Sequence, residues 1–166
     1  MAVVTVKSTQ ITNRDASPSV INDSAYAKGI MKKAVGEAVI TSGNSIASIY
    51  VLCSIPSNAV VSSVLVSSPD IGTTTTGHFG LYKTTAQGGA VVDADFFKAT
   101  VSLKDGAIAK SEVAFGNVMT YANSYKKVWQ HLALAADPQI NYDVCLTLDA
   151  AADGTGTIMV EVQYTE

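Results

Sequence analysis

The sequence INYDVCLTLDAAADGTGTIMVEVQYT, residues 140–165, gives the clearest indication of the fold. Apolar and polar residues alternate over residues 140–149 and again over residues 158–165. A period of two is that of a β-strand with one face buried and the other presented to solvent or a neighbour. Asp153-Gly154 between the two runs is a turn signal, so the sequence predicts an antiparallel pair joined as a hairpin.

A second strand–turn–strand unit is expected at residues 77–103, GHFGLYKTTAQGGAVVDADFFKATVSL. Phe79 and Leu81 alternate with His78 and other residues of the opposite face, as in a half-buried strand. Gly88-Gly89 supplies the positive φ that a chain reversal needs. The chain then returns through apolar residues, of which residues 93–97 are open to interpretation as one turn of helix.

Three further strands are predicted by short apolar runs between turn residues, at residues 38–41, 46–53 and 59–66. The run at 46–53 is nearly continuous, which is expected of a strand covered on both faces. One convincing helix is predicted at about residues 124–136, because the apolar residues there have helical spacing and Ser124 can cap its start. A weaker helical turn is possible at residues 30–38.

These elements predict a mainly β fold with about eight strands. The fold class is an antiparallel two-sheet β-sandwich, jelly-roll-like in the broad sense, with one short helix. Residues 1–29 have no sustained periodicity and are predicted to form an extended arm that orders against a partner. We therefore divide the chain into an arm and lead-in, residues 1–36, and a sandwich domain, residues 37–166.

Composition and charge narrow the functional classes. Hydrophobic residues make up 48% of the 166 residues, enough for one core, whereas charged residues make up only 15%, fewer than is usual. Five bases against two acids give residues 1–36 a net charge of +3, and the remainder carries −6. This segment is expected either to dock on an acidic neighbour or to form a simple solvated tail. The bases are too sparse for nucleic-acid binding.

Residue types that could carry chemistry are few. His78 and His131 are the only histidines, and no pattern frames either of them as a catalytic pair. Asp93 and Asp95 have a spacing found in calcium loops, but two phenylalanines follow where further oxygen ligands would be needed. Zinc-ligand spacings and nucleotide-binding fingerprints are missing from the sequence. The sequence therefore predicts no enzyme, no metal and no cofactor.

The two cysteines and the apolar runs indicate the compartment. Cys53 and Cys145 each lie within an apolar run, which favours buried free thiols over a disulfide. The apolar runs are too short to cross a bilayer, and the first residues lack the features of a signal peptide. We expect a soluble protein made in a cytoplasm, with no membrane partner.

Three segments of the chain form a pattern: SIASIYVLCSIPSNAVVSSVLVSS at residues 45–68, GLYKTTAQGGAVVDADFFKATVSL at residues 80–103, and KVWQHLALAADPQINYDVCLTLDAAADGTGTIMVEVQYTE at residues 127–166. Together they resemble the capsid decoration (cement) proteins of tailed bacteriophages. The resemblance covers roughly residues 37–166. It implies a virion protein, synthesised in a bacterial host, that binds the outer surface of the capsid. Its partners would be the major capsid protein and other copies of itself, as a dimer or trimer.

The basic lead-in is the part of the chain that we expect to contact the capsid or a neighbour. The candidate contact residues are Lys7, Arg14, Tyr26, Lys28, Met31, Lys32 and Lys33. Three other functions stay open at this point. They are a carbohydrate-binding β-sandwich module on a virion surface, a tail or head-fibre component, and a hydrolase with an unrecognised site.

Overall fold

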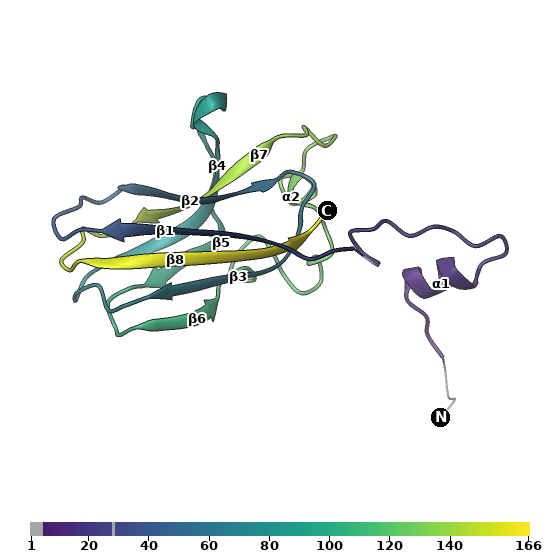
Figure 1. Ribbon diagram of the computed structural model, residues 1–166, viewed down its shortest axis with the longest axis horizontal. Helices are drawn as coiled ribbons and strands as arrows, with labels where there is room; N and C mark the ends of the chain where they lie inside the picture. The colour runs from purple at the N-terminus through teal and green to yellow at the C-terminus, as the bar shows by residue number, and fades with distance from the viewer. Residues whose placement is uncertain (1–4, 28) are drawn as a thin grey trace.

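The computed structural model describes residues 5–27 and 29–166. In this part of the chain, eight strands form two antiparallel four-stranded sheets, and an arm extends from one end (Figure 1). The predicted mainly β, two-sheet sandwich is confirmed. The strands are β1 (Lys32–Ile40), β2 (Ile49–Pro56), β3 (Val60–Ser68), β4 (Thr76–Lys83), β5 (Val91–Ser102), β6 (Ile108–Glu112), β7 (Asn141–Leu148) and β8 (Gly156–Thr165). The helices are α1 (Thr9–Asp15) and α2 (Val128–His131), with a 3-10 turn, η1 (Thr85–Gln87).

The strands pair in a nested order. One sheet has the order β1-β8-β3-β6 and the other β2-β7-β4-β5. The first strand therefore pairs with the eighth, the second with the seventh, the third with the sixth and the fourth with the fifth. The chain has thus folded back on itself about the β4–β5 turn. That turn is the reversal predicted at Gly88-Gly89, where both φ angles are positive, 93° and 63°.

The predicted hairpin at residues 140–165 is wrong in its pairing, although both of its strands are present. β7 belongs to one sheet and β8 to the other. The connection between them is longer than a tight hairpin turn and is held by Asp153. The carboxylate of Asp153 accepts hydrogen bonds from the backbone and hydroxyl of Thr73, at 2.8 and 2.6 Å, and from the backbone of Thr74 at 3.1 Å. The β7–β8 connection is therefore fastened to the β3–β4 loop instead of closing a hairpin.

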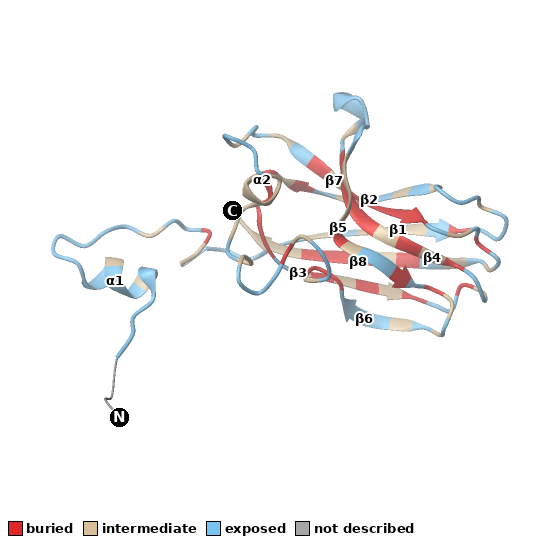
Figure 2. Cartoon of the chain, turned by 180° about the vertical axis from the view of Figure 1, so that it is seen from behind, coloured by how far each residue is buried: buried red, intermediate tan, exposed pale blue. Residues whose placement is uncertain are grey.

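The core lies between the two sheets and contains buried residues of both, including the edge strands β1, β2 and β5. Figure 2 colours the buried segments red. Phe79, Leu81, Leu146 and Ile158 are completely buried. The prediction that residues 46–53 form a strand covered on both faces is wrong. β2 starts later, at Ile49, and its residues alternate between exposed and buried because it is the edge strand of its sheet.

Residues 93–97 form part of β5 and not a helical turn. The pairing register shifts here, because Phe79 pairs with Lys98 whereas Leu81 pairs with Asp93. The extra residues bulge over Gly80, where any side chain would overlap the backbone oxygens of residues 93 and 94. The bulge allows consecutive phenylalanines, Phe96 and Phe97, to be fully buried, with their rings edge to face at 4.9 Å.

The predicted helices differ most from the structure. The helix expected at residues 124–136 shrinks to the four residues of α2, because its first backbone amides bond to the β2–β3 turn. Val128 N–H donates to the Ala59 carbonyl at 2.9 Å, and Trp129 N–H to the Ser57 carbonyl at 3.0 Å. The helical turn considered at residues 30–38 is wrong, since β1 begins at Lys32.

Candidate functional site: the N-terminal arm

Residues 5–22, here called the arm, extend away from the sandwich (Figures 1 and 2). The arm contains α1, whose first turn is capped by Ser8, the side chain of which accepts from Ile11 N–H at 3.4 Å. None of the residues of α1 is buried. A helix of seven residues is too short to be stable alone, because nucleation costs more than a few hydrogen bonds return. Its stability must come from contacts of its side chains.

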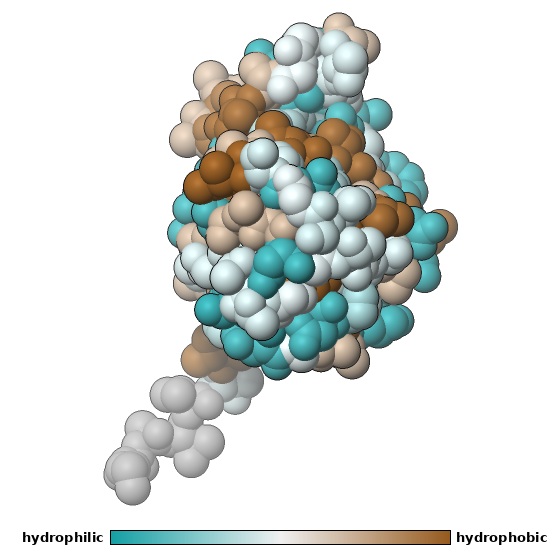
Figure 3. Space-filling view, turned by 90° about the vertical axis from the view of Figure 1, so that its left-hand side faces the viewer, coloured by the Kyte–Doolittle hydropathy of each residue, from teal (hydrophilic) through white to brown (hydrophobic). Residues whose placement is uncertain are grey.

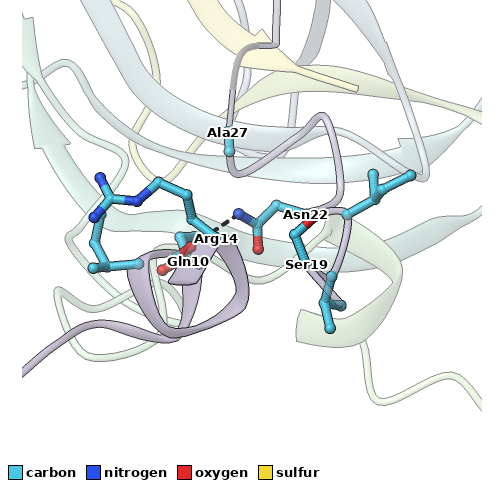
Figure 4. Close-up of a pocket in the computed structure, with 8 residues that line it drawn as sticks. Gln10, Arg14, Ser19, Asn22 and Ala27 are labelled. Atoms are coloured by element: carbon cyan, nitrogen blue, oxygen red, sulfur yellow. Dashed lines mark hydrogen bonds between the residues drawn. The ribbon is translucent and has the colours of Figure 1, made fainter. Parts of the chain in front are cut away.

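A loop folded back on α1 supplies some of these contacts. Asn22 bridges the two, since its side chain accepts from Asn13 Nδ2 at 2.8 Å and donates to the carbonyl of Gln10 at 3.1 Å. The backbone N–H of Val20 also donates to the Asn13 carbonyl at 2.9 Å. Figure 4 shows the Asn22 amide directed at the helix, with its bond to Gln10 dashed. The arm is therefore a small structured unit, where the sequence predicted an extended one.

A clamp joins the arm to the sandwich; it consists of residues 23–27 together with Lys127 and Thr165. Lys127 Nζ lies 2.9 Å from Asp23 Oδ2, and the Thr165 hydroxyl donates to the carbonyl of the buried Ala25 at 2.8 Å. The hydrogen bond from Lys127, followed by that from the Ala25 backbone, lowers the pKa of Asp23. The clamp thus uses one ion pair and one neutral hydrogen bond to fix the direction in which the arm leaves.

Two hollows are formed by the arm. The first, of about 480 Å³, lies against α1 and is lined by Gln10, Ile11, Arg14, Ser19, Val20, Ile21, Asn22 and Ala27 (Figure 4). The second lies between the arm and the sandwich, and its lining includes Tyr26 and, from the β6–α2 loop, Tyr125. Ile21 is 94% exposed and Val20 is 52% exposed. Apolar side chains so exposed beside a hollow mark a surface suited to a protein partner.

The candidate contact residues of the arm are already paired within the chain. Lys7 Nζ and Arg14 Nε lie 2.9 and 2.8 Å from the two carboxylate oxygens of Asp15. Tyr26 is half-buried at the clamp, and Lys28 lies outside the described residues. The positive charge that suggested docking on an acidic neighbour is thus partly balanced by the arm's own carboxylate.

The candidate residues at the start of β1 are placed on the sandwich and not on the arm. Met31 is 58% exposed just before the strand, and Lys32 pairs with Glu166. Lys33 lies 3.6 Å from Glu161 of β8, which Lys110 of β6 approaches equally closely from the other side. A hydrogen bond from Gln163 and these two lysines lower the pKa of Glu161. These charges therefore link three strands of one sheet.

Sequence reasoning missed the apolar part of the arm, because it followed charge. Val20-Ile21, placed two residues after Pro18 in a polar segment, was the available signal. Exposed aromatic residues of the β6–α2 loop were missed as well. Tyr121 is 86% exposed and stacks on Phe115 at 5.3 Å.

The two histidines of the sandwich have different partners. His78 Nδ1 lies 2.6 Å from Asp149 Oδ1 on the outer face of the β4–β7 pair. His131 packs edge to face on Phe96 at 5.9 Å, and burial, with a smaller effect of Lys126, lowers its pKa. Neither histidine lines the two hollows beside the arm.

The described part of the chain contains neither a candidate metal site nor a membrane-spanning helix. Within residues 5–27 and 29–166, no group of three or more His, Cys, Asp or Glu side chains is arranged to hold a metal ion. Cys53 and Cys145 are free thiols, and burial raises the pKa of each to about 12. The helices of the described chain are too short to span a bilayer.

Comparisons with known proteins place the fold. No family model matches the chain, and no curated protein matches it. A chain of the solved cyanophage Pam1 capsid asymmetric unit is 19% identical with a TM-score of 0.55, over 82% of this chain and 85% of that one. A chain of the acid-stable capsid structure of Helicobacter pylori bacteriophage KHP30 is also 19% identical, with a TM-score of 0.40, over 82% and 94%. The Pam1 likeness shows that this fold occurs in a phage capsid.

Proposed function

We propose that this protein is a structural component of a phage virion that decorates the outside of the head and braces the lattice of major capsid protein. The observation that carries the proposal is the arm: a capped helix with none of its residues buried, held away from the sandwich by a defined clamp. Such a segment gains stability when a neighbour covers it. Its exposed Val20 and Ile21 would supply the apolar contact.

The sandwich supports this proposal by its shape. Nested pairing of eight strands in two sheets is the arrangement that we interpret as a jelly roll, an architecture that viral capsid proteins share with lectins. The fold shared with the Pam1 capsid chain agrees with this interpretation. On a lattice, each copy would make a modest contact through its arm, and repetition over neighbouring subunits would add these contacts by multivalency.

Removal of the arm tests the proposal. The deletion should end before the clamp. Removal of residues 1–22 leaves Asp23 and its partners in place, so the sandwich keeps its strands and its anchoring contacts. The full chain is expected to bind heads of its phage that lack it, and the shortened chain to lose most of that occupancy. Ile21→Lys should weaken binding in the full-length protein, whereas Lys104→Gln on the distant β5–β6 loop serves as the matched surface control.

Two results would count against the proposal. Undiminished occupancy by the shortened chain would remove the arm from the mechanism. Failure of the full chain to bind heads under any condition would remove the decoration function altogether. Circular dichroism of the shortened chain verifies that its sandwich is folded.

Carbohydrate binding is the second candidate, and one feature favours it. Tyr121 projects from the β6–α2 loop and is backed by Phe115, which makes an exposed aromatic surface of the kind on which sugar rings stack. Trp129, in contrast, is only partly exposed. Glycan binding that is abolished by Tyr121→Ala and retained by Tyr125→Ala would favour this function over decoration.

A further inference from the structure

The strand register shows which side chains share the outer face of the sheet β2-β7-β4-β5. The even-numbered residues of β7, from 142 to 148, belong to the core, so Asp143, Cys145 and Thr147 point outward. Ile49 of β2 pairs with Thr147, and Val51 pairs with Cys145. Residues directly opposite one another in an antiparallel pair lie on the same face, so Ile49 and Val51 point outward as well.

The exposed side chains of this surface are apolar or acidic. Ile49 and Val51 are 50% and 57% exposed. Asp149, one residue beyond β7, joins them, because its Oδ1 lies 2.6 Å from Nδ1 of His78, which faces outward from β4. We call Ile49, Val51, Asp143 and Asp149 the acidic face. Figure 3 looks onto the end of the sandwich at which β2 begins and shows apolar side chains grouped below the projecting β4–β5 turn.

No lysine or arginine belongs to the strands that carry the acidic face, up to the last residue of β4. The sequence contains neither residue between Lys33 and Lys83 or beyond Lys127. Asp143 is half-buried, and none of the ion pairs in the described chain includes it. A carboxylate that is partly removed from water is more stable when a cation neutralises it. The acidic face therefore lacks the cations that would complete it.

We infer that the acidic face binds a basic segment of another protein, in which lysine or arginine lies beside apolar side chains. The cationic groups would neutralise Asp143 and Asp149, and the apolar side chains would cover Ile49 and Val51. This surface lies on the sandwich. The inference therefore does not depend on the capsid contact that the proposed function assigns to the arm.

Other partners fit the acidic face less well. Two copies of the face placed together would bring their carboxylates toward one another and repel. Nucleic acids and anionic lipid surfaces are repelled for the same reason. The arm of a second copy is a poor occupant, because its Lys7 and Arg14 are already paired with Asp15.

Isothermal titration calorimetry with a short synthetic peptide of alternating lysine and valine tests the inference. We expect the full chain to bind this peptide, and the binding to weaken as the salt concentration rises, because salt screens the attraction between exposed charges. A peptide in which glutamate replaces lysine should not bind. Equal binding of the two peptides, or no binding of the lysine peptide, would overturn the inference.

Two double variants with the same net charge locate the contact. Asp143→Asn combined with Asp149→Asn should weaken binding of the lysine peptide by about tenfold. Asp70→Asn combined with Asp105→Asn removes the same charge from loops outside the face and should bind the peptide as the wild type does. Circular dichroism verifies that both variants keep their strands. Equal affinity of the two folded variants would show that the peptide binds elsewhere and would overturn the inference.

Crosslinking identifies the natural occupant of the face. With the photoreactive residue benzoylphenylalanine in place of Val51, phage particles that contain the protein are expected to yield a crosslinked peptide that carries lysine or arginine and comes from another protein. Mass spectrometry identifies that peptide. Crosslinks only to a second copy of this chain, or only to segments without a base, would contradict a basic partner.

Discussion

Gly36 of β1 lies so close to the carbonyl group of Leu52 in β2 that any side chain at position 36 would overlap the Leu52 oxygen. This contact is where the margins of the two sheets meet, because β1 and β2 are the edge strands of different sheets. The role of Gly36 in the fold is therefore steric. It allows two backbones to approach where a Cβ would hold them apart.

We expect Gly36→Ala to destabilise the protein by about 2 kcal/mol or more, because the added methyl group must push two strands apart in a packed structure. Urea unfolding followed by circular dichroism measures the loss. Val35→Ala, one residue earlier and half-exposed, is the control and should change the free energy of unfolding by no more than about 0.5 kcal/mol. Equal stability of the two variants would contradict the steric role.

The second prediction concerns Asp153, whose carboxylate holds the β7–β8 connection against the β3–β4 loop. In Asp153→Asn, one oxygen becomes an NH2 group that faces donors, so either the hydrogen bonds from Thr73 or those from Thr74 and Thr75 are lost. We expect a lower melting temperature at pH 7, measured by calorimetry. Asp70→Asn, on the same loop, is the matched control and should melt like the wild type.

The stabilisation that the Asp153 carboxylate gives should decrease as the pH falls. Hydrogen bonds from the Thr73 side chain, then from the Thr73 and Thr74 backbones, hold the pKa of this carboxyl well below its ordinary value. A lowered pKa means that the ionised form stabilises the fold above the ordinary carboxyl pKa, near 4, and that this stability is lost as pH falls toward the native pKa. The gap between wild type and variant should therefore narrow below about pH 4. A constant gap would contradict the assignment to ionisation.

The sequence predicts strands well and their partners poorly, and the connections show why. Alternation over residues 140–149 and 158–165 identifies β7 and β8, because burial of one face leaves a period of two. Alternation carries no information on which sheet a strand joins. Asp153-Gly154 suggests a hairpin, whereas in the structure the Asp153 carboxylate accepts hydrogen bonds from Thr73 and Thr74, which lie far away in sequence.

Local signals also mislead where tertiary contacts override them. The spacing of Tyr125, Val128, Trp129 and Leu132 is helical, yet only Val128–His131 forms a helix, because the backbone there bonds to residues 57 and 59. The bulge in β5 is also not predicted. Its two consecutive phenylalanines interrupt the alternation of a strand, and the segment was therefore open to interpretation as a helical turn. In the arm, the charge pattern predicts Lys7 and Arg14 as contact residues, whereas the structure exposes the apolar side chain of Ile21.

The last prediction concerns the clamp, on which the direction of the arm depends. Lys127→Ala removes the partner of Asp23, whose carboxylate also accepts from the Ala25 N–H at 2.9 Å. Because the pair is partly exposed, we expect a loss of at most about 1 kcal/mol, which is a several-fold faster hydrogen exchange of the clamp amides. The amides to follow are those of Tyr26 and Ala27, which bond to the Asp23 carbonyl at 3.0 and 3.1 Å.

Lys7→Ala is the matched control for the clamp, since it removes an exposed lysine paired with an acid of the arm and leaves Lys127 in place. Its clamp amides should exchange as in the wild type, while those of Lys127→Ala exchange faster and the strands of the sandwich keep their protection. Lys127→Ala should also bind phage heads more weakly if the arm is the contact, because a loosened arm loses more conformational entropy on docking. Identical exchange in the two variants would show that Thr165 and the packing of Ala25 hold the arm without the ion pair.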